Sequence, residues 1–273
     1  MFRSRLRVPG PSDTRVNGAA AADARSAVLL DIEGTTTPIA YVTDVLFPYA
    51  RKHLRSHLEE QAGSPAHESL LARLGDEHAA ALRAGDAVPP WIDEPPNARR
   101  SAIEAFVEWL MDRDRKSTAL KGLQGRIWED GYRRGFLVGS VFPDVRPALQ
   151  YWREQRVAVG IFSSGSVLAQ QLLFRHSSDG DLTGFVRWYF DTRVGPKVDP
   201  ESYRRIAMTM GLPGEVCTFL SDVTRELDAA SAAGMQVRLV VRPGNVPVST
   251  THGFQTINTL DEVTPRPEHD ESG

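Results

Sequence analysis

Two carboxylates stand two positions apart directly after a short apolar run near the start of the chain. The run is residues 27–30, and Asp31, Glu33, a glycine and three threonines follow it closely. Such a run predicts a buried strand of a parallel sheet, and ligands of open α/β sheets bind outside the carboxyl ends of the strands. Two acids there suit a divalent metal, or a nucleophile beside a proton donor. The alternative interpretation is an ordinary turn with a helix N-cap.

A second apolar run, residues 157–162, ends in two serines, Ser163 and Ser164, followed by a glycine. Serine hydroxyls and the backbone N–H groups of such a turn can hold phosphate oxygens. The positive end of the helix expected to begin near Val167 would assist them. The alternative is that this serine-rich run, which extends to Ser166, only caps that helix.

Lys197 follows a Gly-Pro turn and precedes a helical pattern from Pro200 to Gly211. The chain has only four lysines against 28 arginines, so lysine is a rare choice here. An ammonium at the edge of the sheet would neutralise a phosphate and a carboxylate together. The alternative is a solvated surface lysine.

Asp222 ends a further strand-like run, residues 216–221, and an alanine-rich helical pattern follows it. Its carboxylate is a candidate metal ligand. Glu226 lies one helical turn later, on the same side of that helix as its start. Asp222 is equally suited to be the N-cap of the helix, and the two roles are compatible.

The four fragments come in the order Asp-x-acid, Ser, Lys and Asp. This order resembles the haloacid-dehalogenase-type phosphotransferase superfamily. Two longer stretches, residues 31–49 and 112–128, resemble the enolase-phosphatase (acireductone synthase) family of methionine salvage within it. The resemblance covers roughly residues 27 to 262.

The chemistry expected from the motifs and this resemblance is hydrolysis of a phosphate monoester through an aspartyl-phosphate. Asp31 would be the nucleophile, and Glu33, which replaces the commoner aspartate, would act as general acid, metal ligand or both. Oxygen ligands suit Mg²⁺, which is the expected cofactor. The expected metal ligands are Asp31, Glu33 and Asp222. The expected phosphate-binding side chains are Ser163, Ser164 and Lys197.

The family resemblance also implies a second step on the same substrate. A 2,3-diketo-5-methylthiopentyl 1-phosphate would first be enolised and then dephosphorylated to the acireductone 1,2-dihydroxy-3-keto-5-methylthiopentene. The sequence does not identify the base, although Glu33 is a candidate. Two alternatives are a plain Mg²⁺-dependent phosphatase acting on another small ester, and a non-catalytic binding module. The intact set of four motifs argues against the second.

The elements that must position these residues alternate between strands and helices. Strands are expected at about 27–32, 157–163, 186–190, 216–221 and 236–241. This alternation predicts a Rossmann-like α/β fold with a parallel sheet covered on both faces. Helical periodicity at 42–57, 68–84, 98–113 and 117–135 predicts a helical cap inserted after the first strand. The expected division is a core of 27–38 and 139–262 with a cap of 39–138.

The bulk properties are those of an ordinary globular protein. A net charge of −3 gives no reason to expect a nucleic acid or a membrane surface as partner. The single cysteine, Cys217, fits a reducing cytoplasm and a place in the core. Residues 1–26 are expected to be a disordered extension, with a transit peptide as the alternative, and 263–273 a disordered tail. We expect a monomer whose partner is a small phosphate substrate.

Overall fold

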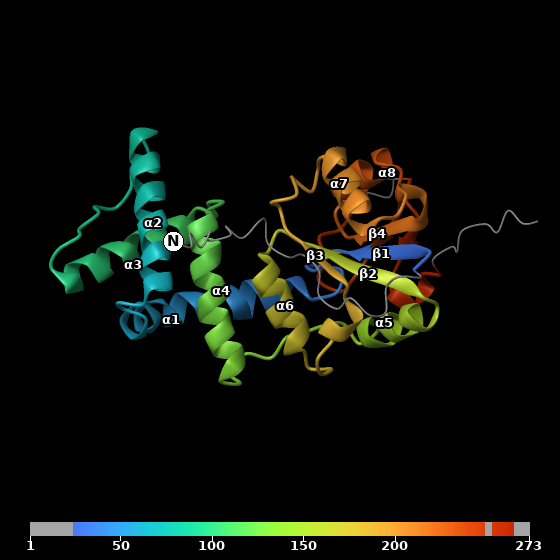
Figure 1. The fold of residues 1–273 in the computed structure, drawn as a ribbon, viewed down its shortest axis with the longest axis horizontal. Coiled ribbons are helices and arrows are strands. Elements are labelled where there is room, and N and C mark those ends of the chain that lie inside the picture. Colours follow the sequence, from blue (N-terminus) through green and yellow to red (C-terminus); the bar gives the residue numbers. More distant parts are fainter. Residues whose placement is uncertain (1–23, 249–252, 265–273) are drawn as a thin grey trace, which may run out of the picture.

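The structure is a computed structural model that describes residues 24–248 and 253–264. Its six strands form one sheet in the order β3-β2-β1-β4-β5-β6, and all of the pairs are parallel (Figure 1). β1 lies in the middle, so the chain winds outward in one direction through β3 and then in the other from β4. The strands are β1 (Ser26–Leu30), β2 (Val157–Phe162), β3 (Trp188–Phe190), β4 (Cys217–Ser221), β5 (Gln236–Val240) and β6 (Thr256–Ile257).

The central strand β1 is buried along its whole length, because both faces of the sheet are covered. Val28 and Leu30 pack into the cluster that includes α5 (Val145–Glu154) and α6 (Val167–Arg175). Ala27 and Leu29 pack into a second cluster with α7 (Pro200–Met210) and α8 (Thr224–Ala232). A strand that is apolar on both sides is what a continuous apolar run predicts.

The second face of the sheet is covered by α7 (Pro200–Met210) and α8 (Thr224–Ala232), which lie above it in Figure 1. Local signals fix the bounds of α7. The Asp199 side chain accepts a hydrogen bond from the Glu201 N–H at 2.9 Å, and Gly211 ends the helix with a φ of 73°.

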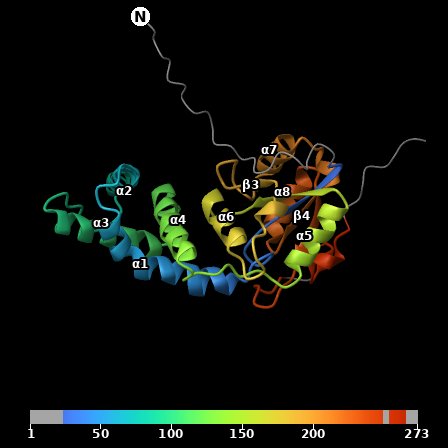
Figure 2. The ribbon, with the colours of Figure 1, turned by 60° about the horizontal axis from the view of Figure 1, so that its bottom comes forward.

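Four long helices fill the chain between β1 and α5, and both views place them beyond one end of the sheet (Figures 1 and 2). A π-helical segment (Tyr41–Leu46) runs directly into the first of them. The fourth, capped by the Ser117 side chain, packs against α6 of the core. These helices are α1 (Phe47–Glu60), α2 (Pro65–Arg83), α3 (Pro96–Asp112) and α4 (Thr118–Arg133). Short 3-10 helices lie at 183–185, 214–216 and 260–262.

The predicted α/β architecture is confirmed, with differences at its ends. β1 begins at Ser26, inside the stretch expected to be an extension, and Val263 is buried although the tail was expected to begin there. β6 was not expected. The remaining parts of the extension and tail, 1–23 and 265–273, lie outside the described residues. Cys217 is fully buried, as expected, and no helix in the described ranges is long and apolar enough to cross a membrane.

Candidate active site

Asp31 is the first residue after β1, and its side chain is buried against the end of β4. Its backbone N–H donates to the Leu220 carbonyl at 3.0 Å, which extends the pairing of β1 with β4 by one residue. Its Oδ1 accepts from the Ile32 N–H at 2.7 Å, and its Oδ2 accepts from the Ser221 hydroxyl at 3.2 Å. The carboxylate is therefore held in one orientation at the carboxyl edge of the sheet.

Lys197 is not a solvated surface lysine. Its Nζ lies 2.7 Å from Asp31 Oδ1 and 2.6 Å from Glu226 Oε2, and only 10% of its side chain is exposed. Burial alone would lower the pKa of Lys197. The two carboxylates outweigh that effect, so its pKa lies above the ordinary value. The ammonium is therefore charged and fixed beside Asp31.

The Gly-Pro turn that carries Lys197 is held against the start of α7. The Ser202 hydroxyl donates to the Pro196 carbonyl at 2.8 Å, and the Tyr203 hydroxyl donates to the Lys197 carbonyl at 2.7 Å. A side chain at Gly195 would meet this packing, since its Cβ would lie 2.2 Å from the Ser202 Oγ. The backbone approach that fixes the lysine thus requires glycine.

Ser163 and Ser164 follow β2 and lie at the same edge of the sheet. Ser163 is buried, and its N–H donates to the Phe190 carbonyl at the end of β3 at 3.2 Å. The cap of α6 is a different serine, Ser166, whose side chain accepts from the Ala169 N–H at 3.3 Å. A serine of this run therefore does cap α6, as the alternative supposed, but neither Ser163 nor Ser164 is the cap.

Asp222 follows β4 and packs against the turn after β1. Its carboxylate lies so close to Gly34 that a Cβ there would be 2.2 Å from Oδ2, and Gly34 has a φ of 69°. The N-cap of α8 is Val223, so the N-cap alternative for Asp222 is wrong. Burial and the Asp31 carboxylate raise the pKa of Asp222 to about 7. This carboxylate sits in a site that disfavours its negative charge.

Glu226 is a site residue that the sequence did not place there. It lies in the first turn of α8, where it pairs with Lys197 and lies 3.1 Å from the Ser221 hydroxyl, whose single hydrogen it shares with Asp31. Burial and Asp31 raise its pKa above the ordinary value. Its spacing of four residues from Asp222 was the available signal. Its pairing with a lysine on another loop was not predictable.

A buried ion pair behind the turn was also missed. Arg242 Nη2 lies 2.8 Å from Asp144 Oδ2, and Arg242 Nε donates to the Thr35 carbonyl at 3.1 Å. Asp144 also accepts from the Leu260 N–H at 2.6 Å. Through the Thr35 carbonyl, these contacts fix the backbone of the turn at residues 31–37.

Glu33 is half-buried at the opening of the site. Burial is the largest cause that raises its pKa, and the negative charges of Asp31 and Asp114 raise it further. The positive charges of Lys197 and Lys121 lower it in part. Asp114 and Lys121 belong to the helical segment between β1 and β2. The Glu33 carboxyl therefore lies where the sheet edge and that helical segment meet.

The carboxyl groups of the site fit a hard divalent cation. In the described ranges, neither Glu33 nor Asp222 takes part in an ion pair, and Asp222 is charged only against a burial penalty. No three His, Cys, Asp or Glu side chains among the described residues are arranged to hold a metal by themselves. Mg²⁺ does not need them, because it is commonly held by one or two carboxylates together with substrate phosphate and water.

Known proteins share this organisation over most of the chain. A family model described as haloacid dehalogenase-like hydrolase matches residues 26–234. The chain belongs to this hydrolase family. It is 47% identical to enolase-phosphatase E1 of Synechococcus elongatus, over 86% of this chain and 96% of that protein. The hydrolase also belongs to the enolase-phosphatase group, since so close a relative is matched over nearly its full length.

Two further relatives extend the comparison. The hydrolase is 42% identical to a Physcomitrium patens protein named probable bifunctional methylthioribulose-1-phosphate dehydratase/enolase-phosphatase E1, over 89% of this chain and 49% of that protein. The solved structure of the UTR4 protein of Saccharomyces cerevisiae has a TM-score of 0.71 and 31% identity, covering 88% of this chain and all of that one.

Two hollows that share lining residues open at the site of this hydrolase. One, of about 700 Å³, lies over the sheet edge and is lined by Asp31, Lys197, Asp222 and Glu226. The other, of about 650 Å³, lies between core and helical segment. Both are lined by Glu33, Ser163 and Ser164, so a ligand held there would reach from one into the other. The structure thus brings all six of the predicted site residues to one place.

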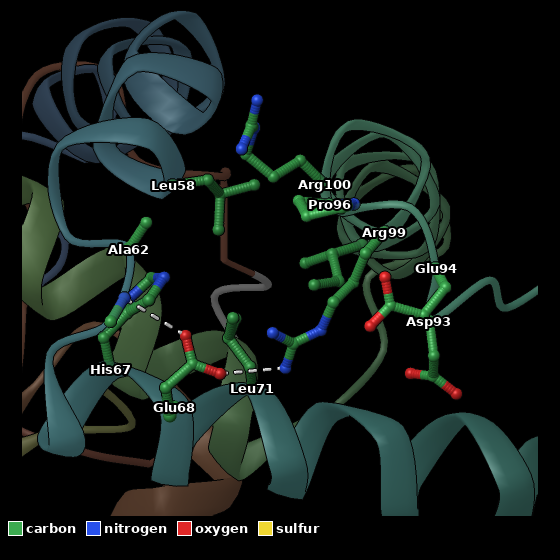
Figure 3. Close-up of a pocket in the computed structure, with 12 residues that line it drawn as sticks. Leu58, Ala62, His67, Glu68, Leu71, Asp93, Glu94, Pro96, Arg99 and Arg100 are labelled. Atoms are coloured by element: carbon green, nitrogen blue, oxygen red, sulfur yellow. Dashed lines mark hydrogen bonds and ion pairs between the residues drawn. The ribbon is translucent and has the colours of Figure 1, made fainter.

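A third hollow, of about 380 Å³, lies between α1, α2 and α3 (Figure 3). Arg99 Nη2 lies 2.9 Å from Glu68 Oε2 across it, and His67 lies against its wall. It contains none of the predicted site residues. We assign it no part in the chemistry.

Proposed function

We propose that this hydrolase converts 2,3-diketo-5-methylthiopentyl 1-phosphate into the acireductone 1,2-dihydroxy-3-keto-5-methylthiopentene and phosphate, as a step of methionine salvage. The names of its relatives, enolase-phosphatase E1 and the bifunctional dehydratase, support this substrate. The observation that carries the chemistry is the Lys197 ammonium between the carboxylates of Asp31 and Glu226. Action in the cytoplasm, and as a monomer, stays a prediction of the sequence.

Asp31 is the nucleophile in this proposal. Its carboxylate oxygen attacks phosphorus and the ester oxygen leaves, which gives an aspartyl-phosphate that water then hydrolyses. Attack by one anion on another requires positive charge at the site, and Lys197 provides it within hydrogen-bond distance of Asp31. Ser163, Ser164 and Lys197 bind the phosphoryl oxygens.

Asp31, Glu33 and Asp222 are the candidate ligands for Mg²⁺, and one or two of them would hold it together with substrate phosphate and water. When bound, the ion supplies further positive charge against the phosphate. The raised pKa of Asp222 supports this assignment, since a nearby cation would favour its ionised form. We propose Mg²⁺ rather than a transition metal because the candidate ligands are all oxygen atoms.

Glu33 is the proposed general acid for the leaving oxygen. Its half-buried position and raised pKa favour a carboxyl that keeps its proton more readily than an exposed one. Proton transfer of this kind typically contributes about 10²–10⁴-fold. Because Glu33 borders both hollows, it is also placed to serve the enolisation step.

The hollow beyond Glu33 suits a substrate with an apolar tail. Phe47 is 44% exposed there, and the Trp128 ring lies 6.2 Å from it between centroids. The indole N–H of Trp128 donates to the Leu46 carbonyl at 2.8 Å, so its ring offers only apolar surface. A methylthio group fits such a wall. The apolar side chains that line this hollow include Val42, Leu46, Phe47, Leu110, Met111 and Trp128.

A plain phosphatase for another small ester is the alternative that uses the same core residues. Turnover of the diketo phosphate with and without Mg²⁺ separates the two, with enol absorbance and phosphate release followed together. We expect an enol signal and phosphate release, both dependent on Mg²⁺. Phosphate release from other small esters without turnover of the diketo phosphate would instead support the plain phosphatase.

A further inference from the structure

Lys121 reaches from the helical segment into the catalytic edge of the core. It lies in the first turn of α4, and its Nζ donates to the backbone carbonyl of Ser164 at 2.9 Å. Ser164 is one of the two proposed phosphate-binding serines. The contact therefore brings a cation of the helical segment onto the backbone of the serine turn at the edge of the site.

Lys121 also faces the proposed general acid. Lys121, Glu33 and Ser164 line the same hollow. Its charge partly offsets the rise that burial and Asp31 cause in the pKa of Glu33. Lys121 lines the hollow that Asp31 does not line, and the carbon skeleton of a phosphate ester bound at Asp31 would extend into that hollow.

The partners of the two site lysines differ. Lys197 is committed to two carboxylates, whereas in the described ranges Lys121 forms no ion pair and bonds a neutral carbonyl oxygen. An ammonium has three N–H donors, so Lys121 keeps donors for a second oxygen. A substrate carbonyl oxygen is a partner of the same kind as the one it already holds.

We propose that Lys121 binds the carbonyl oxygen next to the phosphate-bearing carbon and stabilises the enolate that forms there. This assignment rests on the proposed function and adds a catalytic residue that serves enolisation rather than phosphate transfer. A cation held where negative charge develops is among the largest contributions that a protein makes to catalysis.

The step balances without any further reactant. Glu33 takes a proton from the phosphate-bearing carbon, the C–H electron pair forms the carbon–carbon double bond, and the carbonyl electron pair moves to the oxygen held by Lys121. Glu33 then gives its proton to the ester oxygen when the bond to phosphorus breaks. The water that hydrolyses the aspartyl-phosphate gives its oxygen and one hydrogen to phosphate, and its second proton goes to the enolate oxygen, which becomes the other hydroxyl of the product. Nothing is oxidised or reduced.

The test compares an ester that must be enolised with one that cannot be. We use the diketo phosphate and phenyl phosphate with Lys121→Met, with Lys121→Arg, which keeps the charge, and with Lys52→Met as the matched control. Lys52 is an exposed lysine of α1 that lines none of these hollows. Thermal melts establish that each variant is folded.

For Lys121→Met we expect kcat on the diketo phosphate to fall about 10²-fold or more, the usual loss when one oxyanion donor is removed. Exchange of the hydrogen on the phosphate-bearing carbon with D₂O should fall with it. Phenyl phosphate hydrolysis should stay within about twofold of the parent. Lys121→Arg keeps the positive charge, so it should retain most of the kcat on the diketo phosphate that Lys121→Met loses.

Equal losses on both esters would overturn the assignment, because Lys121 would then only hold the serine turn. Unchanged kcat and unchanged solvent exchange on the diketo phosphate would overturn it as well. Failure of the proposed function looks different. In that case the unaltered protein itself hydrolyses phenyl phosphate but neither enolises nor dephosphorylates the diketo phosphate.

Discussion

The Nζ atom of Lys197 lies 2.7 Å from Oδ1 of Asp31, in a pocket that leaves each side chain no more than a tenth exposed. The two residues come from distant parts of the chain, and the parallel register of the sheet brings them together. Glu226 is the second carboxylate that pairs with the Lys197 ammonium. Because the charges are buried, each depends on the others for its ionised form.

Replacing Lys197 with methionine should abolish most turnover and also weaken the fold. The change leaves Asp31 and Glu226 as unpaired buried carboxylates, so unfolding should become easier by about 3 kcal/mol in urea titrations. In the double variant Lys197→Met/Glu226→Gln, part of the stability should return but no activity. Unchanged turnover in the folded single variant would show that Lys197 has no catalytic part.

Gly34→Ala tests how the turn after β1 positions Asp222. The new Cβ would lie 2.2 Å from Asp222 Oδ2, so this carboxylate must move. We expect the Mg²⁺ concentration needed for half-maximal activity to rise about 10–100-fold.

Gly85→Ala is the matched control for this change. Gly85 has a similar φ of 85°, and no atom of the described residues lies within 4 Å of its Cβ position. The free energy of unfolding of Gly85→Ala should fall by about 1–3 kcal/mol through backbone strain alone, and its Mg²⁺ dependence should stay that of the parent. The same Mg²⁺ dependence in both alanine variants would contradict the positioning role of Gly34.

Two buried histidines of the helical segment predict a pH-dependent stability. The rings of His57 and His67 lie 5.7 Å apart, and burial, with His67 beside it, lowers the pKa of His57 to about 4. Between about pH 6.5 and 4 the unfolded chain binds a proton at this position and the folded chain does not. Stability must therefore fall as the pH falls through this window, by up to about 3 kcal/mol from His57.

Urea titrations from pH 4 to 7.5 measure this slope. His57→Leu should flatten it. His53→Leu, at a half-exposed position one turn earlier in α1, should leave it as in the parent. The charged groups that also face His57 are Arg126, Asp130 and Glu60, and all of these are retained in both variants. An equal slope in the parent and in His57→Leu would contradict the prediction.

Asp222→Asn should stop both enolisation and phosphate release, because both are proposed to need the same Mg²⁺. Raising the Mg²⁺ concentration should restore part of both together. Asp228→Asn, at an exposed position of the helix α8 that follows Asp222, should have no effect. Loss of phosphate release alone, with enolisation intact, would show that Asp222 does not serve both steps.

The sequence predicted the residues at the ends of the strands because each carries its own local signal. An apolar run locates the strand, and a parallel sheet places every strand's end at one edge, so Asp31, Ser163 and Asp222 had to converge. β6 was too short for such a signal. The pairing of Glu226 with Lys197 depends on how α8 packs against the loop that carries Lys197, and no local sequence pattern encodes this packing.

Contacts between distant elements were likewise beyond the sequence. The pairing of Arg242 with Asp144 joins segments whose relative position is set only by the folded sheet. The contact of Lys121 with Ser164 depends on the orientation of the helical segment against the core. Nothing in the sequence around Lys121 distinguishes it from a solvent-exposed lysine of a helix.

The most direct test of the whole account is NMR of the diketo phosphate in D₂O with the parent protein and with Asp31→Asn. Asparagine keeps the shape and one oxygen of Asp31 but cannot attack phosphorus. The parent should form the enol and release phosphate. Asp31→Asn should still exchange the hydrogen on the phosphate-bearing carbon, while phosphate release falls more than about 10³-fold. Phosphate release by Asp31→Asn within tenfold of the parent, or release by the parent without any enol, would contradict the account.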